Sequence, residues 1–233
     1  MKKIHLRRYP RRLSFDVLFK YASVAPSRVS SIWTFLNSLF EIFSLNCCLQ
    51  CQKESVPLVC EKCLNRIERV QNSATGPFSY GRYEDVLKNL IHLFKYENKF
   101  ALASPLAKLL LEVAPQNADM IIPVPLHFKK LQERKYNQSV LLGRELAKAA
   151  QIPLYVDVLK KTVPTPSQTE LSQAERQKNV FNTFSVDKAN KIINKHVLLL
   201  DDVYTTGATG AECERMLLQA GAQKVSIVTL ARS

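Results

Sequence analysis

Residues 197–210 read VLLLDDVYTTGATG. The first four residues form an uninterrupted apolar run, which is typical of a strand buried on both faces of a parallel sheet. Asp201 and Asp202 follow where this run ends, and a turn rich in threonine and glycine leads from them into a predicted helix. Ligands of parallel α/β sheets bind at the carboxyl ends of the strands. The stretch therefore predicts both an α/β fold and the place of a binding site.

The turn after the two acids predicts a phosphate site. Backbone N–H groups and the positive end of the helix dipole attract a phosphate there, threonine hydroxyls add donors, and a glycine lets the backbone approach closely. The residues expected around the phosphate are Thr205, Thr206, Gly207, Ala208 and Thr209. Asp201 and Asp202 are placed to accept hydrogen bonds from two neighbouring hydroxyls, or to engage magnesium through its water shell. A phosphate, a diol and magnesium together describe a ribose 5-phosphate with a leaving group at its anomeric carbon.

The chain before and after this stretch alternates predicted strands and helices. After a hairpin-like segment at 78–85, strands are expected at 120–125, 153–161, 196–203 and 224–232. Helices are expected at 86–94, 101–113, 138–150, 171–180 and 208–222. Strands separated by helices of this length imply right-handed crossovers and a largely parallel sheet with flanking helices.

The cysteines predict a metal site. Five of the six lie in residues 47–63, CCLQCQKESVPLVCEKC. The pairs Cys48/Cys51 and Cys60/Cys63 each have two residues between them, so both thiolates of a pair can reach one tetrahedral ion. Four thiolates leave no open position, which indicates structural zinc in a small zinc-ribbon-like module rather than a catalytic metal. Cys47 lies outside this spacing, as a possible substitute ligand, and Cys213 is expected to be a small core residue.

The net charge of +13 favours polyanionic partners such as nucleic acid, phosphorylated metabolites or acidic lipid. Residues 1–46 contain eight basic and two acidic residues, so much of the excess lies in a basic arm and the segment after it. Apolar residues recur at helical spacing from 32 to 43, which predicts an amphipathic helix. This helix either covers the core or the cysteine module, or docks on a membrane surface or a partner.

The sequence predicts three parts and a cytoplasmic location. The parts are a basic arm with the amphipathic helix (1–46), the four-cysteine zinc module (47–77) and the α/β domain (78–233). No stretch reaches the roughly 18 apolar residues of a membrane span, and no signal-peptide cleavage site follows the basic N-terminus. Peripheral contact with the inner membrane is left open.

VLLLDDVYTTGATG resembles the phosphoribosyl pyrophosphate (PRPP) motif of type I phosphoribosyltransferases, which has a hydrophobic run, two acids and a threonine/glycine loop. With the paired cysteines, PVPLHFKKLQERKYNQS (123–139) and TPSQTELSQAERQKNVFNTF (165–184), residues 47–233 are similar to the ComF/GntX competence family. The resemblance implies a type I phosphoribosyltransferase core with an N-terminal zinc module. It also implies PRPP with magnesium as the ligand, and a part in moving incoming single-stranded DNA into the cytoplasm during natural transformation.

The resemblance also suggests basic site residues. The middle motif of the family, Arg-Gly-aromatic-Asn-Gln, reads RKYNQ at 134–138, and lysine in place of glycine leaves the local backbone conformation in question. Arg134 and Lys135 are candidates for the pyrophosphate side, and Arg134 is grouped with Asp201 and Asp202 as catalytic. Arg176 matches the region of a mobile loop that closes over substrate. Solvated surface positions are the alternative for all three cations.

Two functions stay open. The first is a PRPP-binding factor that supports import of single-stranded DNA, with DNA-uptake proteins at the inner membrane as partners. The second is an active phosphoribosyltransferase of nucleotide metabolism with an unidentified acceptor. Direct DNA contact is predicted for a group of four basic residues and one aromatic residue, because proteins that bind single strands combine positive charge with base stacking. The group is Lys129, Lys130, Arg134, Lys135 and Tyr136.

Overall fold

The computed structural model describes residues 47–126, 131–132, 136–162 and 182–233. These residues belong to one compact unit, Asn46–Ser233. The predictions for the basic arm and amphipathic helix (1–46), for the helix at 171–180 and for five basic side chains fall outside the described residues. Those side chains are Lys129, Lys130, Arg134, Lys135 and Arg176. The division into three parts stays a prediction.

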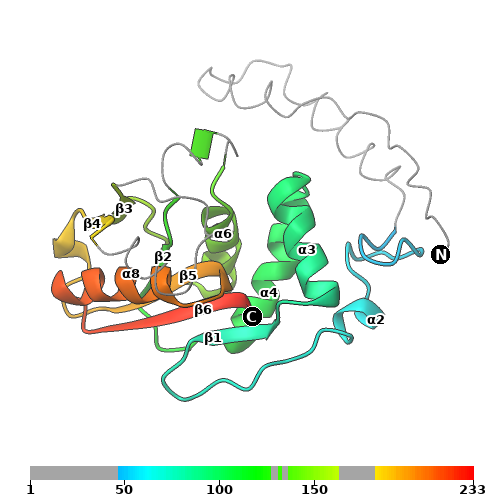
Figure 1. Cartoon of the computed structure of the whole chain (residues 1–233), viewed down its shortest axis with the longest axis horizontal. Coiled ribbons are helices and arrows are strands. Elements are labelled where there is room, and N and C mark those ends of the chain that lie inside the picture. Colours follow the sequence, from blue (N-terminus) through cyan, green and yellow to red (C-terminus); the bar gives the residue numbers. More distant parts are fainter. Residues whose placement is uncertain (1–46, 127–130, 133–135, 163–181) are drawn as a thin grey trace. The chain divides into compact units, whose positions relative to one another are not determined.

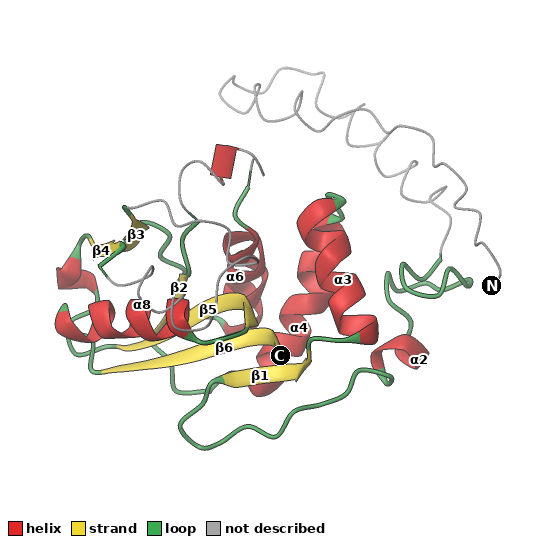
Figure 2. Cartoon of the chain, in the orientation of Figure 1, coloured by secondary structure: helices red, strands yellow, loops and turns green. Residues whose placement is uncertain are grey.

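Four parallel strands form the main sheet in the order β1-β6-β5-β2. The long central strands are β5 (His196–Tyr204) and β6 (Lys224–Arg232). The shorter β2 (Met120–Pro123) pairs with β5, and β1 (Phe78–Arg82) pairs with β6. Figure 2 shows the strands of this sheet in yellow. Because every pairing in the sheet is parallel, the carboxyl ends of its strands lie at one edge. The parallel α/β fold is confirmed.

Helices cover both faces of the sheet (Figure 1). One face carries α3 (Asp85–Tyr96), α4 (Ala103–Val113) and α6 (Gln138–Ala150), and the other carries α8 (Ala208–Gln219). Leu198 and Leu200 of β5 are buried in one cluster with the first three helices, whereas Val197 and Leu199 are buried in a second cluster with α8. Alternate side chains of a strand point to opposite faces. An uninterrupted apolar run therefore suits β5, which is covered on both sides.

Two segments, 78–85 and 153–161, do not have the form predicted for them. Residues 78–85 do not form a hairpin, because β1 is a single strand that runs parallel to β6 and leads into α3. Residues 153–161 do not form one strand. Leu154 makes an isolated parallel bridge with Ile121, and only β3 (Leu159–Lys161) is a strand, antiparallel to β4 (Phe184–Val186) in a separate sheet. The apolar pattern of a segment does not identify its partner, so the sequence left these pairings open.

The cysteine segment packs against the N-terminal part of the α/β core. Cys48, Cys63 and Ile67 are buried in the same cluster as the apolar face of α3. Only one turn of helix, α2 (Glu61–Leu64), occurs here, directly after Cys60. Polar contacts add to the packing, since Asn89 Nδ2 donates to Gln50 Oε1 at 2.6 Å and Arg66 pairs with Asp85 at 2.7 Å.

Short 3-10 turns at Phe100–Leu102 and Ala189–Lys191 complete the described secondary structure. Among the residues that the structure describes, no helix has both the length and the apolar character needed to cross a bilayer.

Candidate functional site

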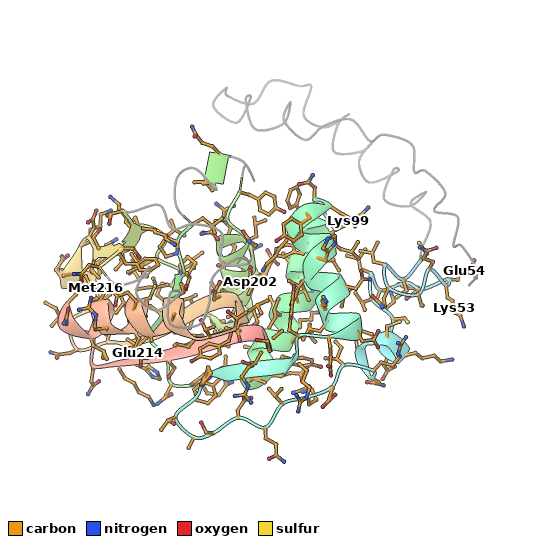
Figure 3. The ribbon with its side chains drawn as sticks, viewed as in Figure 1. Lys53, Glu54, Lys99, Asp202, Glu214 and Met216 are labelled. Carbon is orange, nitrogen blue, oxygen red and sulfur yellow. The ribbon has the colours of Figure 1, made fainter. Side chains whose placement is uncertain are left out.

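Asp201 and Asp202 lie near the carboxyl end of β5 and differ in burial. By strand alternation Asp202 continues the Leu198 and Leu200 series toward α3 and α6, whereas Asp201 continues the Leu199 series toward α8. Asp202 is 7% exposed, and Asp201 is half-buried. Figure 3 labels Asp202 beside α6 near the end of the β5 ribbon. The two acids are adjacent in sequence, but they face different surroundings.

Asp201 is held by two hydrogen bonds to one of its oxygens. Its Oδ1 accepts from Ser139 Oγ at 3.3 Å and from the backbone N–H of Asp202 at 2.9 Å. Burial of the carboxyl group and the neighbouring charge of Asp202 raise the pKa of Asp201 to about 7, although the N–H of Asp202, Lys95 and Ser139 act in the opposite direction. A cation, or hydrogen-bond donors that a ligand brings, would stabilise the ionised form of a carboxyl group with such a pKa.

Asp202 accepts a hydrogen bond from Lys95 Nζ at 2.7 Å, and the two side chains are 10% and 13% exposed. Burial lowers the pKa of Lys95, but the charge and hydrogen bond of Asp202, together with the charge of Asp201, raise it overall, so the side chain is a cation at neutral pH. Lys95 belongs to α3 and lies far from Asp202 in sequence. Lys95 is not among the residues predicted for the site, because nothing in the local pattern FKYEN distinguishes it from a surface lysine.

The tail of the RKYNQ motif links three elements around the acids. Asn137 caps α6 by accepting the N–H of Ser139 at 2.9 Å, and its Nδ2 donates to the carbonyl oxygen of Val124 at 3.1 Å, just after β2. The hydroxyl of Tyr136 lies 2.7 Å and 2.8 Å from the carbonyl oxygens of Phe94 and Lys95 in α3, to which it can donate. The motif thus joins the end of β2, the start of α6 and the end of α3.

The rings of Tyr136 and Phe100 pack in a T-shaped arrangement, with 4.7 Å between the ring centroids. The sequence predicts Tyr136 as the aromatic residue for direct DNA contact. In the structure its hydroxyl and its ring make contacts within the fold. The cations grouped with it lie outside the described residues, so direct DNA contact stays a prediction.

The predicted phosphate turn is tightly built. Gly207 is the N-cap of α8 and has φ +76°, a conformation that side-chain-bearing residues rarely adopt. A Cβ at this position would lie 2.2 Å from the hydroxyl oxygen of Tyr204. The helix begins at once, with the N–H of Ala211 donating to the Gly207 carbonyl oxygen at 2.8 Å. The start of a helix of this length carries the partial positive charge that attracts anions.

The structure brings most of the described candidates together at one strand end. Thr205 is exposed, Thr206 and Thr209 are half-buried, and Gly207 and Ala208 are buried in the turn that follows Asp201 and Asp202. The roles of these residues toward a ligand stay predictions.

Asn182 and Thr183 are fixed by contacts with the end of β3 and with α8. The N–H of Thr162 donates to the carbonyl oxygen of Thr183 at 2.8 Å, next to the β3-β4 pairing. Glu212 of α8 is 7% exposed and accepts the N–H of Asn182 at 2.7 Å, and Arg215 pairs with Glu212 at the same distance. The helix that begins at the phosphate turn therefore also holds the backbone at Asn182, just before β4.

The four paired cysteines converge as their spacing predicts. The sulfur atoms of Cys48, Cys51, Cys60 and Cys63 all lie within 4.8 Å of one another. Cys51 and Cys60 are separated by 3.8 Å. A tetrahedral zinc ion with Zn–S bonds of about 2.3 Å needs sulfur atoms about 3.8 Å apart, so the set fits such an ion. Burial opposes ionisation of Cys48, but backbone hydrogen bonds lower its pKa to about 6, whereas burial and the neighbouring thiols raise the pKa of Cys63 to about 12.

The two remaining cysteines are not part of this group. Cys47 makes an isolated antiparallel bridge with Glu54. Cys213 is fully buried in the cluster between α8 and the sheet, as expected of a core residue, and burial raises the pKa of its thiol.

Comparison with known proteins agrees with this architecture. Residues 136–233 match the family model described as "Phosphoribosyl transferase domain". This match covers the RKYNQ tail, the acid pair, the phosphate turn and the last strand. A parallel sheet with helices on both faces, ending in two acids and a glycine turn before a helix, defines the class as phosphoribosyltransferase-like.

Three curated relatives narrow the class to a family. "Competence protein F" of Haemophilus influenzae is 34% identical over 163 residues, which cover 66% of this chain and 71% of the relative. "DNA utilization protein YhgH" of Escherichia coli (strain K12) is 31% identical over 184 residues, or 76% and 78% of the two chains. "Competence protein ComFC" of Bacillus subtilis is 30% identical over 196 residues, or 80% and 78%. The chain belongs to the ComF family.

Proposed function

We propose that this chain binds PRPP with magnesium at the carboxyl edge of the sheet and supports import of single-stranded DNA in natural transformation. The observation that carries the PRPP proposal is the sequence of features at the end of β5. Two acids are followed directly by a glycine turn that opens onto the N-terminus of α8. The match of residues 136–233 to the phosphoribosyl transferase domain supports the same assignment.

Each part of PRPP has a complementary group at this edge. The 5-phosphate is assigned to the turn from Thr205 to Thr209, where hydroxyls and helix N–H groups are donors. The ribose hydroxyls are assigned to the acid pair. Arg134 and Lys135 are proposed for the pyrophosphate and Arg176 for a covering position, as the family resemblance implies.

Magnesium fits the donor set of the acid pair, because carboxylate oxygens are the hard ligands that it prefers, often through its water shell. A divalent cation near Asp201 also offsets the burial that makes this carboxyl costly to ionise. Bound with PRPP, the ion would neutralise charge on the pyrophosphate. The protein groups would then position the ribose and hold its phosphate.

For the cysteine cluster we propose a structural zinc ion. The four sulfur atoms fit a closed tetrahedral site with no position left for a substrate. Metal binding would connect the two halves of a segment that otherwise contains a single helical turn, and would hold it against α3.

The DNA-related part of the proposal is supported by the relatives and by charge. Relatives of this chain are named competence proteins and DNA utilization proteins. The net charge of +13 suits a polyanionic partner. We place the protein in the cytoplasm, with DNA-uptake proteins at the inner membrane as its partners.

Calorimetric titration of the full-length protein with PRPP and magnesium tests the site. We expect binding by the wild type, a loss of at least tenfold in affinity for Asp201→Asn and for Thr206→Val, and no change for Asp119→Asn. Asp119 is a suitable control because it lies at the opposite end of the sheet, where it accepts the backbone N–H of His196. Equal affinity in the wild type and in both site variants would refute the assignment.

Two further measurements separate the functions. Release of pyrophosphate with a panel of acceptor bases would identify an active phosphoribosyltransferase of nucleotide metabolism, and PRPP binding without release would favour a binding factor. A fluorescent single-stranded oligonucleotide tests direct DNA contact, with affinity expected to fall steeply as salt increases. Absence of binding at low salt would exclude direct contact.

A further inference from the structure

Lys95 and Asp202 form a largely buried ion pair. The ammonium and carboxylate atoms are 2.7 Å apart, and the side chains are 13% and 10% exposed. Lysine is rarely buried to this extent unless it is paired. Removing one partner of a buried pair leaves an unpaired charge, whereas removing both is often tolerated. The two side chains should therefore behave as one unit.

The backbone that carries Lys95 is fixed from two directions. The apolar face of α3, including Leu90, Ile91 and Phe94, is fully buried in the core. At the last turn of the helix, the Tyr136 hydroxyl lies within hydrogen-bond distance of the carbonyl oxygens of Phe94 and Lys95 itself. The backbone at Lys95 is therefore held in place, and this fixes the position of the ammonium group at the edge of the sheet.

The two acids stand on different sides of β5. Asp202 points toward α3, where its carboxylate accepts a hydrogen bond from Lys95 Nζ. Asp201 follows Leu199 in the strand alternation, on the side of α8, the helix that begins at the phosphate turn. Its Oδ1 also accepts from Ser139 at the start of α6, and it is the more exposed of the two acids. A ligand phosphate at the start of α8 would therefore share its side of the strand with Asp201.

We propose that Lys95 is a positioning residue that gives the two acids separate tasks. It holds Asp202 in a buried ion pair that fixes the end of β5 against α3, and it leaves Asp201 as the acid that meets the ribose hydroxyls or the water shell of magnesium. This inference rests on the proposed PRPP site. Because the Lys95–Asp202 pair is neutral as a unit, the edge presents one acidic charge to a strongly anionic ligand instead of two.

A double-mutant cycle with PRPP and magnesium as the titrated probe tests the proposal. Lys95→Met and Asp202→Asn each leave one buried charge unpaired, which should displace the end of β5. We expect each single variant to bind PRPP about tenfold or more weakly than the wild type. The double variant removes both charges and should bind PRPP more tightly than either single variant. Affinities are measured on the folded fraction, so that a loss of stability alone does not move them.

Two controls accompany the cycle. Lys148→Met removes an exposed lysine that pairs with Glu145 and is 73% exposed, and it should leave the affinity unchanged. Asp201→Asn should abolish binding with or without the double substitution. If the wild type itself does not bind PRPP, the proposed function fails, and the inference fails with it.

If the wild type binds but the double variant is as weak as Asp202→Asn, Asp202 contacts the ligand directly and the division of tasks is wrong. Amine-directed labelling of the wild type, read by mass spectrometry, covers the case in which the variants do not fold. Lys95 should label much more slowly than Lys148 both without and with PRPP and magnesium. Labelling of Lys95 at the rate of Lys148 in either condition would overturn the proposal.

Discussion

Replacing Asp201 by asparagine should change how the stability of the fold depends on pH. The ordinary pKa of this carboxyl, 3.8, applies in the unfolded chain, and burial next to Asp202 raises it to about 7 in the folded protein. Between these values the folded protein holds a proton that the unfolded chain has released. The free energy of unfolding therefore falls as the pH rises through this window, and above the window the ionised carboxyl destabilises the folded protein.

The size of the effect follows from the two pKa values. The linkage relation gives a destabilisation of about 1.5 kcal/mol at pH 5 and about 4 kcal/mol at pH 8. Asparagine has nearly the same shape and keeps an oxygen that can accept from Ser139 and from the N–H of Asp202. It does not ionise. The advantage of Asp201→Asn over the wild type should therefore grow by about 2 to 3 kcal/mol between pH 5 and pH 8.

Urea unfolding followed by circular dichroism at several pH values measures this difference. Asp157→Asn is the matched control, because the Asp157 pKa is lowered by the hydrogen bond and charge of Lys188 and by the charge of Lys191. Its contribution is complete by about pH 5 and is lost only as the pH falls further, so its difference from the wild type should stay constant from pH 5 to pH 8. A constant difference for Asp201→Asn, or one that favours the wild type increasingly with pH, would refute the reasoning.

Two further predictions concern the turn and the cysteines. Gly207→Ala should lower the free energy of unfolding by about 1 to 3 kcal/mol in urea titrations, because a Cβ would meet Tyr204 and φ is positive. An unchanged unfolding midpoint would contradict the tight turn. Cys63→Ser should reduce bound zinc well below one ion per chain, measured by atomic absorption. In the wild type, a chelator that removes the zinc should unfold the cysteine segment. Cys213→Ala, outside the cluster, should keep its zinc, and equal zinc in both variants would count against a four-cysteine site.

The raised pKa of Asp201 illustrates a common property of binding sites. A carboxyl that is costly to ionise in the free protein lowers stability, but it is the group that gains most when a ligand supplies a cation or donors. Stability and ligand binding are thus expected to respond to Asp201→Asn in opposite directions, which makes the two assays independent tests of the same side chain.

The local pattern of the sequence determined the central strand, the acids at its end and the turn before α8. It did so because a strand buried on both faces needs an uninterrupted apolar run, and because a tight turn needs Gly207. Cysteine spacing determined which four sulfur atoms would meet, since two intervening residues bring both thiols of a pair to one point. These features depend on residues close together in the chain.

Only the tertiary structure decided which segments are neighbours. It placed β1 beside β6, separated Leu154 from β3, and brought Lys95 to Asp202 across more than a hundred residues. Each of these contacts joins segments that are distant in sequence, and the apolar pattern of either segment alone fits several partners. The difference between the two acids has the same origin, because burial and the charge of Lys95 come from α3 and not from the residues beside them.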